Sequence, residues 1–361
     1  MLKKRGLFLV LFLVYIYAFA QAREYTPEEK LAQMFMLGFK GASLPEFAAF
    51  VSGNHWGGYI FYAEDTNIAD SGQAAGFLQS IAGRSSDTKI KPFLAVDMEG
   101  GGWQLAKEKT DKGLVYFVSP RNIAGTDPES RKSWAENIAA YTKTLGFNLN
   151  LSPVVDVDRS PFNNSRSFGG TAETVIENAR LFLDAHQANG VVCALKHFPG
   201  RGSGRQEDID NLYERASDLR PFQALAAHQN TGLIMISTLV YPNIDPDKPA
   251  HKSPEAYKLL RALGYRNIAL TDDISGCGAT IEELQNEIVE IIEAGADMLL
   301  LANKGGNYDP QLSVKLRQAV KNIVRRRLIT EERIEESFAR ILAVKQKHNI
   351  EPEEIYLNYE I

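Results

Sequence analysis

Cysteine is scarce in this chain of 361 residues, which contains only Cys193 and Cys277. Cys193 lies within the apolar run Val191–Leu195, so we expect a buried free thiol there rather than a disulfide. The six histidines are scattered, and no two are four residues apart, the spacing that sets two metal ligands on one helix face. The sequence therefore predicts neither a disulfide framework nor a metal site.

The chain also lacks an excess of one charge. Lysine and arginine number 40 against 45 aspartates and glutamates, which gives a net charge of −5. No basic block is interleaved with aromatic residues, and the short run Arg325–Arg327 is typical of a solvated helix end. Nucleic acid is therefore not an expected partner. A Pro/Ser-rich linker, a low-complexity segment and an internal repeat are also missing, which favours a single domain.

The apolar run Leu7–Ala20 is shorter than the roughly 20 residues that a membrane span needs. The basic segment Lys3–Arg5 precedes it, and the small-x-small site Ala20–Ala22 follows, as in a secretory signal peptide. We therefore predict a signal peptide over residues 1–22 and one catalytic domain over 23–361. The mature protein would be exported to the periplasm or the exterior, without stable membrane insertion. The alternative is an uncleaved N-terminal anchor.

Short apolar runs with strand character alternate with longer segments of helical period along the whole chain. Such nearly continuous apolar strands are typical of a parallel sheet that is covered on both faces. Closing eight units gives a (β/α)8 TIM-like barrel, and a doubly wound open sheet is the alternative. The eight runs are Met34–Phe39, Gly58–Tyr62, Pro92–Val96, Asn148–Val155, Val191–Leu195, Leu233–Ile236, Asn267–Thr271 and Met298–Leu301.

Helix start and stop signals lie between these runs. Thr26–Glu29 combines a capping box with a proline in the first turn, and Thr280–Glu283 repeats the capping box. Other helices are predicted between a polar N-cap and a later glycine. These predicted helices lie between Asp127 and Gly146, Thr171 and Gly190, Ser253 and Gly264, and Thr280 and Gly295, with a last helix from about Thr330 to His348.

Polar residues follow the apolar runs, and in such a barrel the carboxyl ends of the strands form the active site. The set is acidic, with one lysine and one histidine, and it suits a ligand rich in hydroxyl groups. Two members have structural alternatives, because Asp273 could cap the following helix and Lys196 could pair with a carboxylate. The residues are Asp97, Glu99, Asp156, Asp158, Lys196, His197, Ser237, Thr238, Asp272, Asp273 and Asn303.

The motif Lys196–Gly202, which reads KHFPGRG, resembles glycoside hydrolase family 3 and in particular its bacterial β-N-acetylhexosaminidases. The resemblance covers nearly the whole predicted mature chain, and further segments match in the order of the family. These segments are Gln33–Phe39, Ala95–Gly101, Leu151–Val157, Ser165–Gly169, Tyr241–Ala250 and Leu270–Asp273.

The resemblance implies a role for each matching residue. Asp272 matches the nucleophile that forms a covalent glycosyl intermediate in this retaining family. Asp97, Arg166, Lys196 and His197 match residues that hold the hydroxyl groups of the terminal sugar. It also implies an oligosaccharide substrate with terminal β-linked N-acetylglucosamine, from cell-wall or chitin-type material, and no metal or organic cofactor. We expect the protein to be a monomer.

The chain departs from the family at the general acid/base. The family carries an Asp-x-His pair on the loop after the lysine-histidine motif, and its histidine transfers the proton. Here the loop Gly202–Asn211 contains no histidine, and the alignment sets Asp208 on the aspartate and Asp210 on the histidine. Three further positions differ: Arg201 replaces the second histidine of the motif, Gly102 replaces an arginine before Trp103, and Thr238 replaces a histidine.

Three interpretations of these departures stay open. In the first, Asp210 or Glu207 acts as the acid/base, with a pKa raised by burial or by Asp208. In the second, the protein is a sugar-binding pseudoenzyme of the cell envelope, a sensor or scaffold with weak or no hydrolysis. In the third, the loss of the arginine at Gly102 changes the sugar specificity.

Overall fold

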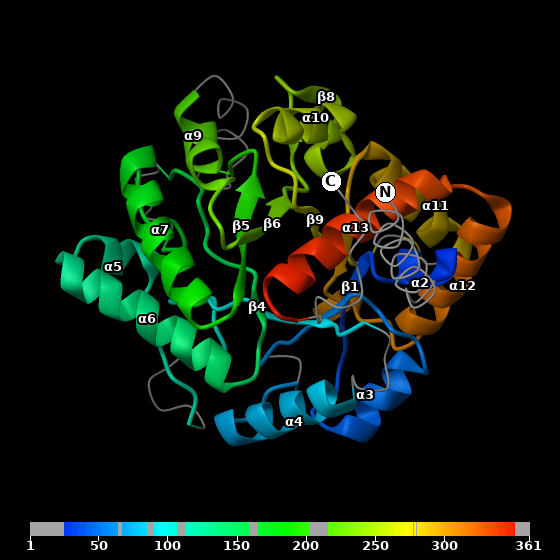
Figure 1. Cartoon of the computed structure of the whole chain (residues 1–361), viewed down its shortest axis with the longest axis horizontal. Helices are drawn as coiled ribbons and strands as arrows, with labels where there is room; N and C mark the ends of the chain where they lie inside the picture. Colours follow the sequence, from blue (N-terminus) through cyan, green and yellow to red (C-terminus); the bar gives the residue numbers. More distant parts are fainter. Residues whose placement is uncertain are drawn as a thin grey trace, which may run out of the picture.

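The computed structural model describes residues 25–63, 67–84, 90–106, 113–158, 165–201, 216–276, 278 and 280–350. Eight parallel strands close into a barrel in the order β1-β10-β9-β6-β5-β4-β3-β2, and helices surround them (Figure 1). The predicted (β/α)8 barrel is therefore confirmed. The strands are β1 (Phe35–Gly38), β2 (Gly58–Ile60), β3 (Phe93–Val96), β4 (Leu149–Asn150), β5 (Val192–Phe198), β6 (Thr231–Ile236), β9 (Ile268–Asp273) and β10 (Met298–Leu301).

The helices begin where the sequence carries N-caps. Thr26 and Thr280 both form the predicted capping boxes, and Asp127, Thr171, Ser253 and Thr330 accept backbone hydrogen bonds as caps. The helices are α2 (Pro27–Ala32), α3 (Leu44–Val51), α4 (Ser71–Arg84), α5 (Pro120–Ala124), α6 (Pro128–Thr144), α7 (Ala172–Ala188), α9 (Ala216–Leu225), α10 (Pro254–Ala262), α11 (Ile281–Ala294), α12 (Leu312–Arg326) and α13 (Glu331–Lys347).

Each of the eight predicted apolar runs overlaps a barrel strand, but the fourth strand is much shorter than expected. Only Leu149–Asn150 of the run Asn148–Val155 is strand, followed by an isolated bridge between Val154 and Lys196. Pro153 accounts for the break, because proline lacks the N–H that a continuous ladder needs. A two-stranded hairpin of β7 (Val240–Tyr241) and β8 (Asp245–Pro249) is an addition that the sequence did not predict.

The core requires close approach of neighbouring segments. A Cβ atom at Gly38 would lie 1.8 Å from the carbonyl oxygen of Ala302, so only glycine fits where β1 meets the end of β10. Phe39 lies just beyond β1, and its ring packs against Phe47 and Phe50 of α3 with centroid distances of 5.3 and 5.7 Å. These aromatic contacts attach the helix to the barrel wall.

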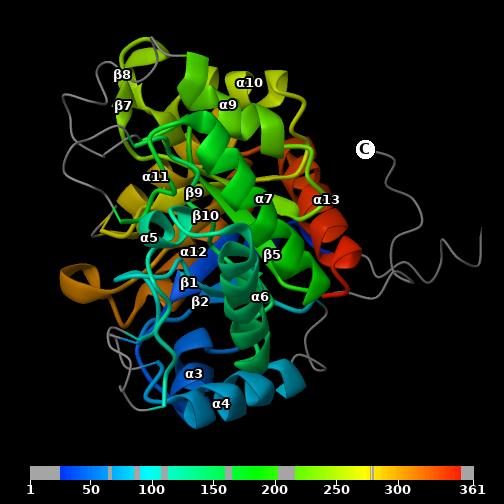
Figure 2. The same cartoon turned by 90° about the vertical axis from the view of Figure 1, so that its left-hand side faces the viewer.

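Helix α13 closes the amino-terminal end of the barrel, away from the β7–β8 hairpin (Figure 2). Its Lys345 is fully buried and donates to Gln33 Oε1 at 3.0 Å and to the carbonyl oxygens of Gly57 at 3.1 Å and Lys91 at 2.7 Å. These three acceptors precede β1, β2 and β3. One ammonium group therefore ties the starts of three strands to the last helix.

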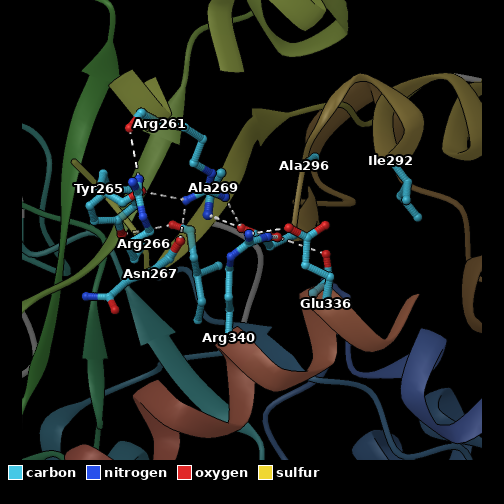
Figure 3. Close-up of polar contacts among 12 residues, drawn as sticks. Arg261, Tyr265, Arg266, Asn267, Ala269, Ile292, Ala296, Glu336 and Arg340 are labelled. Atoms are coloured by element: carbon cyan, nitrogen blue, oxygen red, sulfur yellow. Dashed lines mark hydrogen bonds and ion pairs between the residues drawn. The ribbon is translucent and has the colours of Figure 1, made fainter. Parts of the chain in front are cut away.

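A second buried charge holds the same helix. Asp297, directly before β10, is fully buried and accepts hydrogen bonds from Arg261 Nη2 at 2.6 Å, Arg340 Nη1 at 2.8 Å and the backbone N–H of Ala269 at 2.8 Å. Figure 3 shows that Arg340 projects from α13 and that Arg261 lies on the opposite side of the polar contacts. Ser337 Oγ also donates to this carboxylate at 2.8 Å.

Other predictions from the sequence have mixed outcomes. Cys193 is a buried free thiol, as expected, and Cys277 lies outside the described residues. Asp273 does not cap the following helix, because Thr280 does; instead its Oδ1 accepts from the backbone N–H groups of Ser275 and Ala302.

The predicted signal peptide, residues 1–22, lies outside the described part of the chain. No helix within that described part is long and apolar enough to span a bilayer.

We predict that Asp297→Asn lowers the free energy of unfolding by at least about 3 kcal/mol, because it leaves the Arg261 and Arg340 guanidinium groups without their shared carboxylate. Urea unfolding monitored by circular dichroism measures this. Glu255→Gln is the matched control: its pair with Lys258 is more than half exposed, and its loss should cost less than about 1 kcal/mol. Equal stability of the two variants would contradict the assigned role of Asp297.

Candidate active site

Four charged side chains contact one another at the carboxyl ends of β3 and β5. Lys196 Nζ lies 2.6 Å from Asp97 Oδ1 and 2.6 Å from Glu99 Oε1. Arg166 binds the same Glu99 through two hydrogen bonds, Nε to Oε2 at 2.9 Å and Nη2 to Oε1 at 2.8 Å. The two carboxylates and two cations cancel, so the cluster does not call for an ionic ligand.

In this cluster, burial and the neighbouring charges shift the pKa values in opposite directions, and the charges have the larger combined effect. Burial alone would raise the pKa of Glu99, but Lys196 and Arg166 lower it to about 2. Burial would likewise lower the pKa of Lys196, but Asp97 and Glu99 raise it above its ordinary value. Lys196 is therefore a permanent cation, suited to binding oxygen atoms and unsuited to accepting a proton.

Backbone contacts fix the segment that carries Glu99. Asn150 on β4 accepts from the N–H of Met98 at 2.9 Å and donates to its carbonyl oxygen at 3.1 Å. Gly100 follows with a φ of +92°, and a Cβ atom there would lie 2.6 Å from the carbonyl oxygen of Val118. Glycine thus permits the turn that brings Glu99 beside Lys196.

The loop that carries Arg166 is attached to the segment after β4. Ser167 Oγ donates to the carbonyl oxygen of Asp156 at 2.7 Å, and the N–H of Asp158 donates to the carbonyl oxygen of Gly169 at 3.0 Å. Arg121 of α5 adds an ion pair with Asp158 at 3.2 Å. These contacts hold the Arg166 guanidinium where it meets Glu99.

Asp156 organises the end of β5. It accepts from His197 Nδ1 at 2.8 Å, from the N–H of His197 at 3.1 Å and from the N–H of Arg201 at 2.7 Å. Burial would raise the pKa of Asp156, but His197 and these backbone groups lower it. Because an ionised carboxylate only accepts, the Nδ1 of His197 is the donor in this contact.

Asp272 is the last residue but one of β9 and is partly exposed, with its carboxylate Oδ2 3.7 Å from Arg201 Nη1. In the closed strand order β9 is four positions from β3 in either direction. The end of β9 that carries Asp272 therefore lies opposite the end of β3, which Asp97 and Glu99 follow, at the barrel mouth. Arg201, which the sequence marked only as a departure from the family motif, is the cation that lies beside this carboxylate.

Two further residues near Asp272 were not predicted from the sequence. Tyr241 is buried, and burial, with a smaller effect of Asp156 and Asp272, raises the pKa of its hydroxyl group. His251 is also buried, and its Nδ1 has no hydrogen-bond partner among the described residues. Burial, then Lys252, lowers the pKa of His251 to about 4 despite the opposing charge of Asp272. Tyr241 begins a segment that matches the family and His251 directly follows that segment, but nothing in the sequence assigned a role to either residue.

The predicted acid/base candidates Asp208, Asp210 and Glu207 lie outside the described residues, between 201 and 216. Within the described residues, no group of three or more His, Cys, Asp or Glu side chains is arranged to hold a metal ion. A cavity of about 260 Å³ does occur elsewhere, at the amino-terminal side of the barrel, lined by residues that include Gln33, His55 and Ile90. Catalytic groups of this fold occupy the other end.

Comparison with known proteins now identifies the family. The domain described as glycosyl hydrolase family 3 N terminal domain matches residues 26–344. The chain belongs to glycosyl hydrolase family 3. This family assignment agrees with the eight-stranded barrel.

Relatives of this family 3 chain include β-hexosaminidases. β-Hexosaminidase A of Pseudoalteromonas piscicida is 28% identical over 336 residues, which cover 84% of this chain and 55% of that protein. The β-hexosaminidase of Idiomarina loihiensis is 31% identical over 63% of this chain and 72% of its own length. The chain thus spans about half the length of the Pseudoalteromonas relative.

Solved structures of family 3 agree with the fold. A β-N-acetylglucosaminidase from Paenibacillus sp. str. FPU-7 superposes with a TM-score of 0.76 at 27% identity, covering 91% of this chain and 63% of that one. A β-N-acetylhexosaminidase from Beutenbergia cavernae gives a TM-score of 0.72 at 25% identity, covering 89% of this chain and 99% of that one. The chain is therefore a family 3 barrel similar to bacterial β-hexosaminidases.

Glu99 of this family 3 barrel provides a test of the charge cluster. Its pKa falls from 4.5 unfolded to about 2 folded, so the stabilisation is complete above the unfolded pKa and is lost as pH falls toward the folded one. We predict that the free energy of unfolding declines between about pH 5 and pH 2 more steeply in the wild type than in Glu99→Gln.

The difference between the two proteins at neutral pH should be up to about 3 kcal/mol. Denaturant melts at several pH values measure both quantities. Glu173→Gln, which removes an exposed pair with Arg220, serves as the control and should follow the wild-type profile. If the free energy of unfolding of Glu99→Gln declined with falling pH as steeply as that of the wild type, Lys196 and Arg166 would not be stabilising the ionised Glu99 carboxylate.

Proposed function

We propose that this chain is an exported retaining glycoside hydrolase that removes terminal β-linked N-acetylglucosamine, or a related β-sugar, from cell-wall or chitin-type oligosaccharides. One observation carries the proposal: the partly exposed carboxylate of Asp272 lies at the same end of the barrel as a charge-balanced cluster of Asp97, Glu99, Lys196 and Arg166. The relatives named β-hexosaminidases support the choice of sugar.

The chemistry begins with attack of Asp272 on the anomeric carbon. The bond from that carbon to the leaving oxygen breaks, and an acid on the loop after β5 gives the oxygen its proton. Water then attacks the glycosyl ester from the same side as the departed group, and the loop residue, now a base, takes its proton. Two inversions restore the β-configuration of the released sugar.

The cluster opposite Asp272 suits the hydroxyl groups of a sugar. Lys196 and Arg166 only donate hydrogen bonds, whereas the carboxylate of Asp97 only accepts. Since a hydroxyl group both donates and accepts, the two kinds of side chain together satisfy adjacent hydroxyls. Arg201 Nη1, 3.7 Å from Asp272 Oδ2, places a positive charge beside the proposed nucleophile.

The acid is proposed to be Asp210, with Glu207 as the alternative from the same loop. A carboxylic acid can replace the imidazole if a like-charged neighbour such as Asp208 or burial raises its pKa. In retaining enzymes the two catalytic carboxyl groups lie about 5–5.5 Å apart. The loop between 201 and 216 must therefore bring its acid to that distance from Asp272.

Asp272→Ala should reduce hydrolysis of an aryl β-N-acetylglucosaminide by at least about 10³-fold, because alanine cannot form the glycosyl ester that the mechanism requires. Release of the aryl alcohol, followed by absorbance, measures the rate. Asp184→Asn removes an exposed carboxylate on α7, far along the outer surface, and should keep the wild-type rate. Wild-type turnover by Asp272→Ala would refute the assignment of the nucleophile.

Asp210→Asn should slow substrates with poor leaving groups by about 10²–10⁴-fold, because protonation of the leaving oxygen is lost. Substrates with an acidic aryl alcohol need little protonation, so their first step should slow far less. A series of aryl glycosides of graded leaving-group pKa measures this, with Glu207→Gln run beside it. If Glu207→Gln alone shows the steep dependence, Glu207 is the acid.

The absence of a histidine in the loop Gly202–Asn211 also supports a second candidate, a sugar-binding pseudoenzyme of the cell envelope. Calorimetry with N-acetylglucosamine oligomers, alongside the hydrolysis assay, separates the two. Binding without turnover over days favours the pseudoenzyme. A panel of aryl glycosides in the same assay tests the change of sugar specificity suggested by Gly102. Faster hydrolysis of the glucoside than of the N-acetylglucosaminide would reveal that change.

A further inference from the structure

Strand β4 ends at Asn150, and the side chain of this last residue continues the hydrogen bonding between β4 and the segment after β3. Asn150 Oδ1 accepts from the N–H of Met98 at 2.9 Å, and Asn150 Nδ2 donates to the carbonyl oxygen of Met98 at 3.1 Å. Since β3 ends at Val96, Met98 lies beyond the strand pairing. The amide side chain thus satisfies both backbone groups of Met98 in place of a neighbouring strand.

Met98 lies between the two carboxylates that contact Lys196. Asp97 Oδ1 and Glu99 Oε1 are each 2.6 Å from Lys196 Nζ. Because the backbone between these carboxylates passes through Met98, its two hydrogen bonds with Asn150 also determine where both carboxylates lie. The charge cluster therefore depends on the orientation of the Asn150 amide.

A buried histidine of α7 contacts that amide. His186 Nε2 lies 3.0 Å from Asn150 Nδ2, and the imidazole is fully buried. His186 Nδ1 lies 2.8 Å from the carbonyl oxygen of Phe182, which can only accept, so Nδ1 carries the proton. Burial lowers the pKa of His186 to about 4, so the imidazole is neutral at neutral pH and its Nε2 is an acceptor.

These donors and acceptors leave the Asn150 amide one satisfactory orientation. His186 Nε2 requires a donor and the N–H of Met98 requires an acceptor, so the amide nitrogen faces the first and the amide oxygen faces the second. A flipped amide would bring two acceptors together at His186 and two donors together at Met98, with buried groups left unpaired. Phe182 also stacks on the imidazole with a centroid distance of 4.0 Å, which helps to hold the ring in this position.

We infer that His186 is a positioning residue for the sugar site, because through Asn150 it holds the segment Asp97–Glu99 against Lys196. The effect on sugar binding rests on the proposed function, whereas the orientation of the amide rests on the contacts alone. His186 itself is too deeply buried to touch a ligand.

Asn148 provides an internal comparison at the start of the same strands. Its Oδ1 accepts from the N–H of Leu94 at 2.7 Å, and its Nδ2 donates to the carbonyl oxygen of Pro92 at 3.2 Å. Among the described residues no histidine is hydrogen-bonded to this second amide. A change at His186 should therefore affect Met98 and leave Leu94 as a reference.

Amide hydrogen exchange followed by NMR tests the orientation without a substrate. In His186→Leu the N–H of Met98 should exchange about tenfold faster relative to that of Leu94, because the Asn150 amide is no longer held in one orientation. His186→Gln, whose side-chain oxygen can accept from Asn150, should restore most of the protection. An unchanged ratio of the two exchange rates in His186→Leu overturns the inference.

The nitrogen chemical shifts of the imidazole provide a second test, which needs only the wild-type protein. At neutral pH they should report a proton on Nδ1 of His186 and none on Nε2. A proton on Nε2 would remove the acceptor for Asn150 and overturn the inference, even if His186→Leu does not fold.

Kinetics with an aryl β-N-acetylglucosaminide test the consequence for the sugar site. His186→Leu should raise KM about tenfold and change kcat less than about threefold, because Asp97 binds the sugar whereas Asp272 attacks it. His186→Gln should restore most of the wild-type KM. Asn178→Leu is the matched control: it removes another buried amide of α7, whose hydrogen bond stays within that helix, and should keep the wild-type KM.

An unchanged KM in His186→Leu, or an equal rise in Asn178→Leu, overturns the positioning role. If the wild type neither hydrolyses nor binds the sugar, the proposed function fails. The exchange ratio of Met98 to Leu94 then supports or overturns by itself the claim that His186 holds the segment Asp97–Glu99.

Discussion

The buried ammonium group of Lys196 is the charge around which the barrel mouth is built. Removing such a cation from water costs several kcal/mol unless carboxylates compensate for the loss. Glu99 and Asp97 provide that compensation, and Arg166 balances the second carboxylate. Because these partners come from β3, β5 and the loop after β4, satisfying one buried charge also fixes three separate segments. The orientation of the Trp103 ring follows from it through Arg166.

The two ends of the barrel use charge differently. At the amino-terminal end Asp297 and Lys345 are fully buried, and backbone and side-chain groups from several elements surround them. That end is closed by α13 and has no accessible reactive group in these networks. At the carboxyl end Asp272 and Asp97 stay partly exposed beside their cations. In the proposed function, the networks that stabilise the barrel and the residues that bind sugar are thus at opposite ends of the barrel axis, as is common in this fold.

Much of the fold could be predicted because its signals are local. Apolar runs, N-caps such as Thr280 and strand-ending carboxylates such as Asp272 are visible within a few residues. The long-range contacts had no such signal: the stacking of Arg166 on Trp103, the approach of Arg201 to Asp272 and the burial of His251 depend on tertiary packing. Asp273 shows the limit of local inference, because it joins β9 to the end of β10 instead of capping a helix.

The central claim is that Asp272 becomes covalently bonded to the sugar. Incubation with a 5-fluoro β-N-acetylglucosaminyl fluoride, which slows the second step more than the first, should trap that ester. Intact-protein mass spectrometry should then show a gain of one glycosyl unit, and peptide mapping should assign it to the segment that contains Asp272. An adduct on a different carboxylate, or hydrolysis that releases the inverted α-sugar without any adduct, would contradict the account.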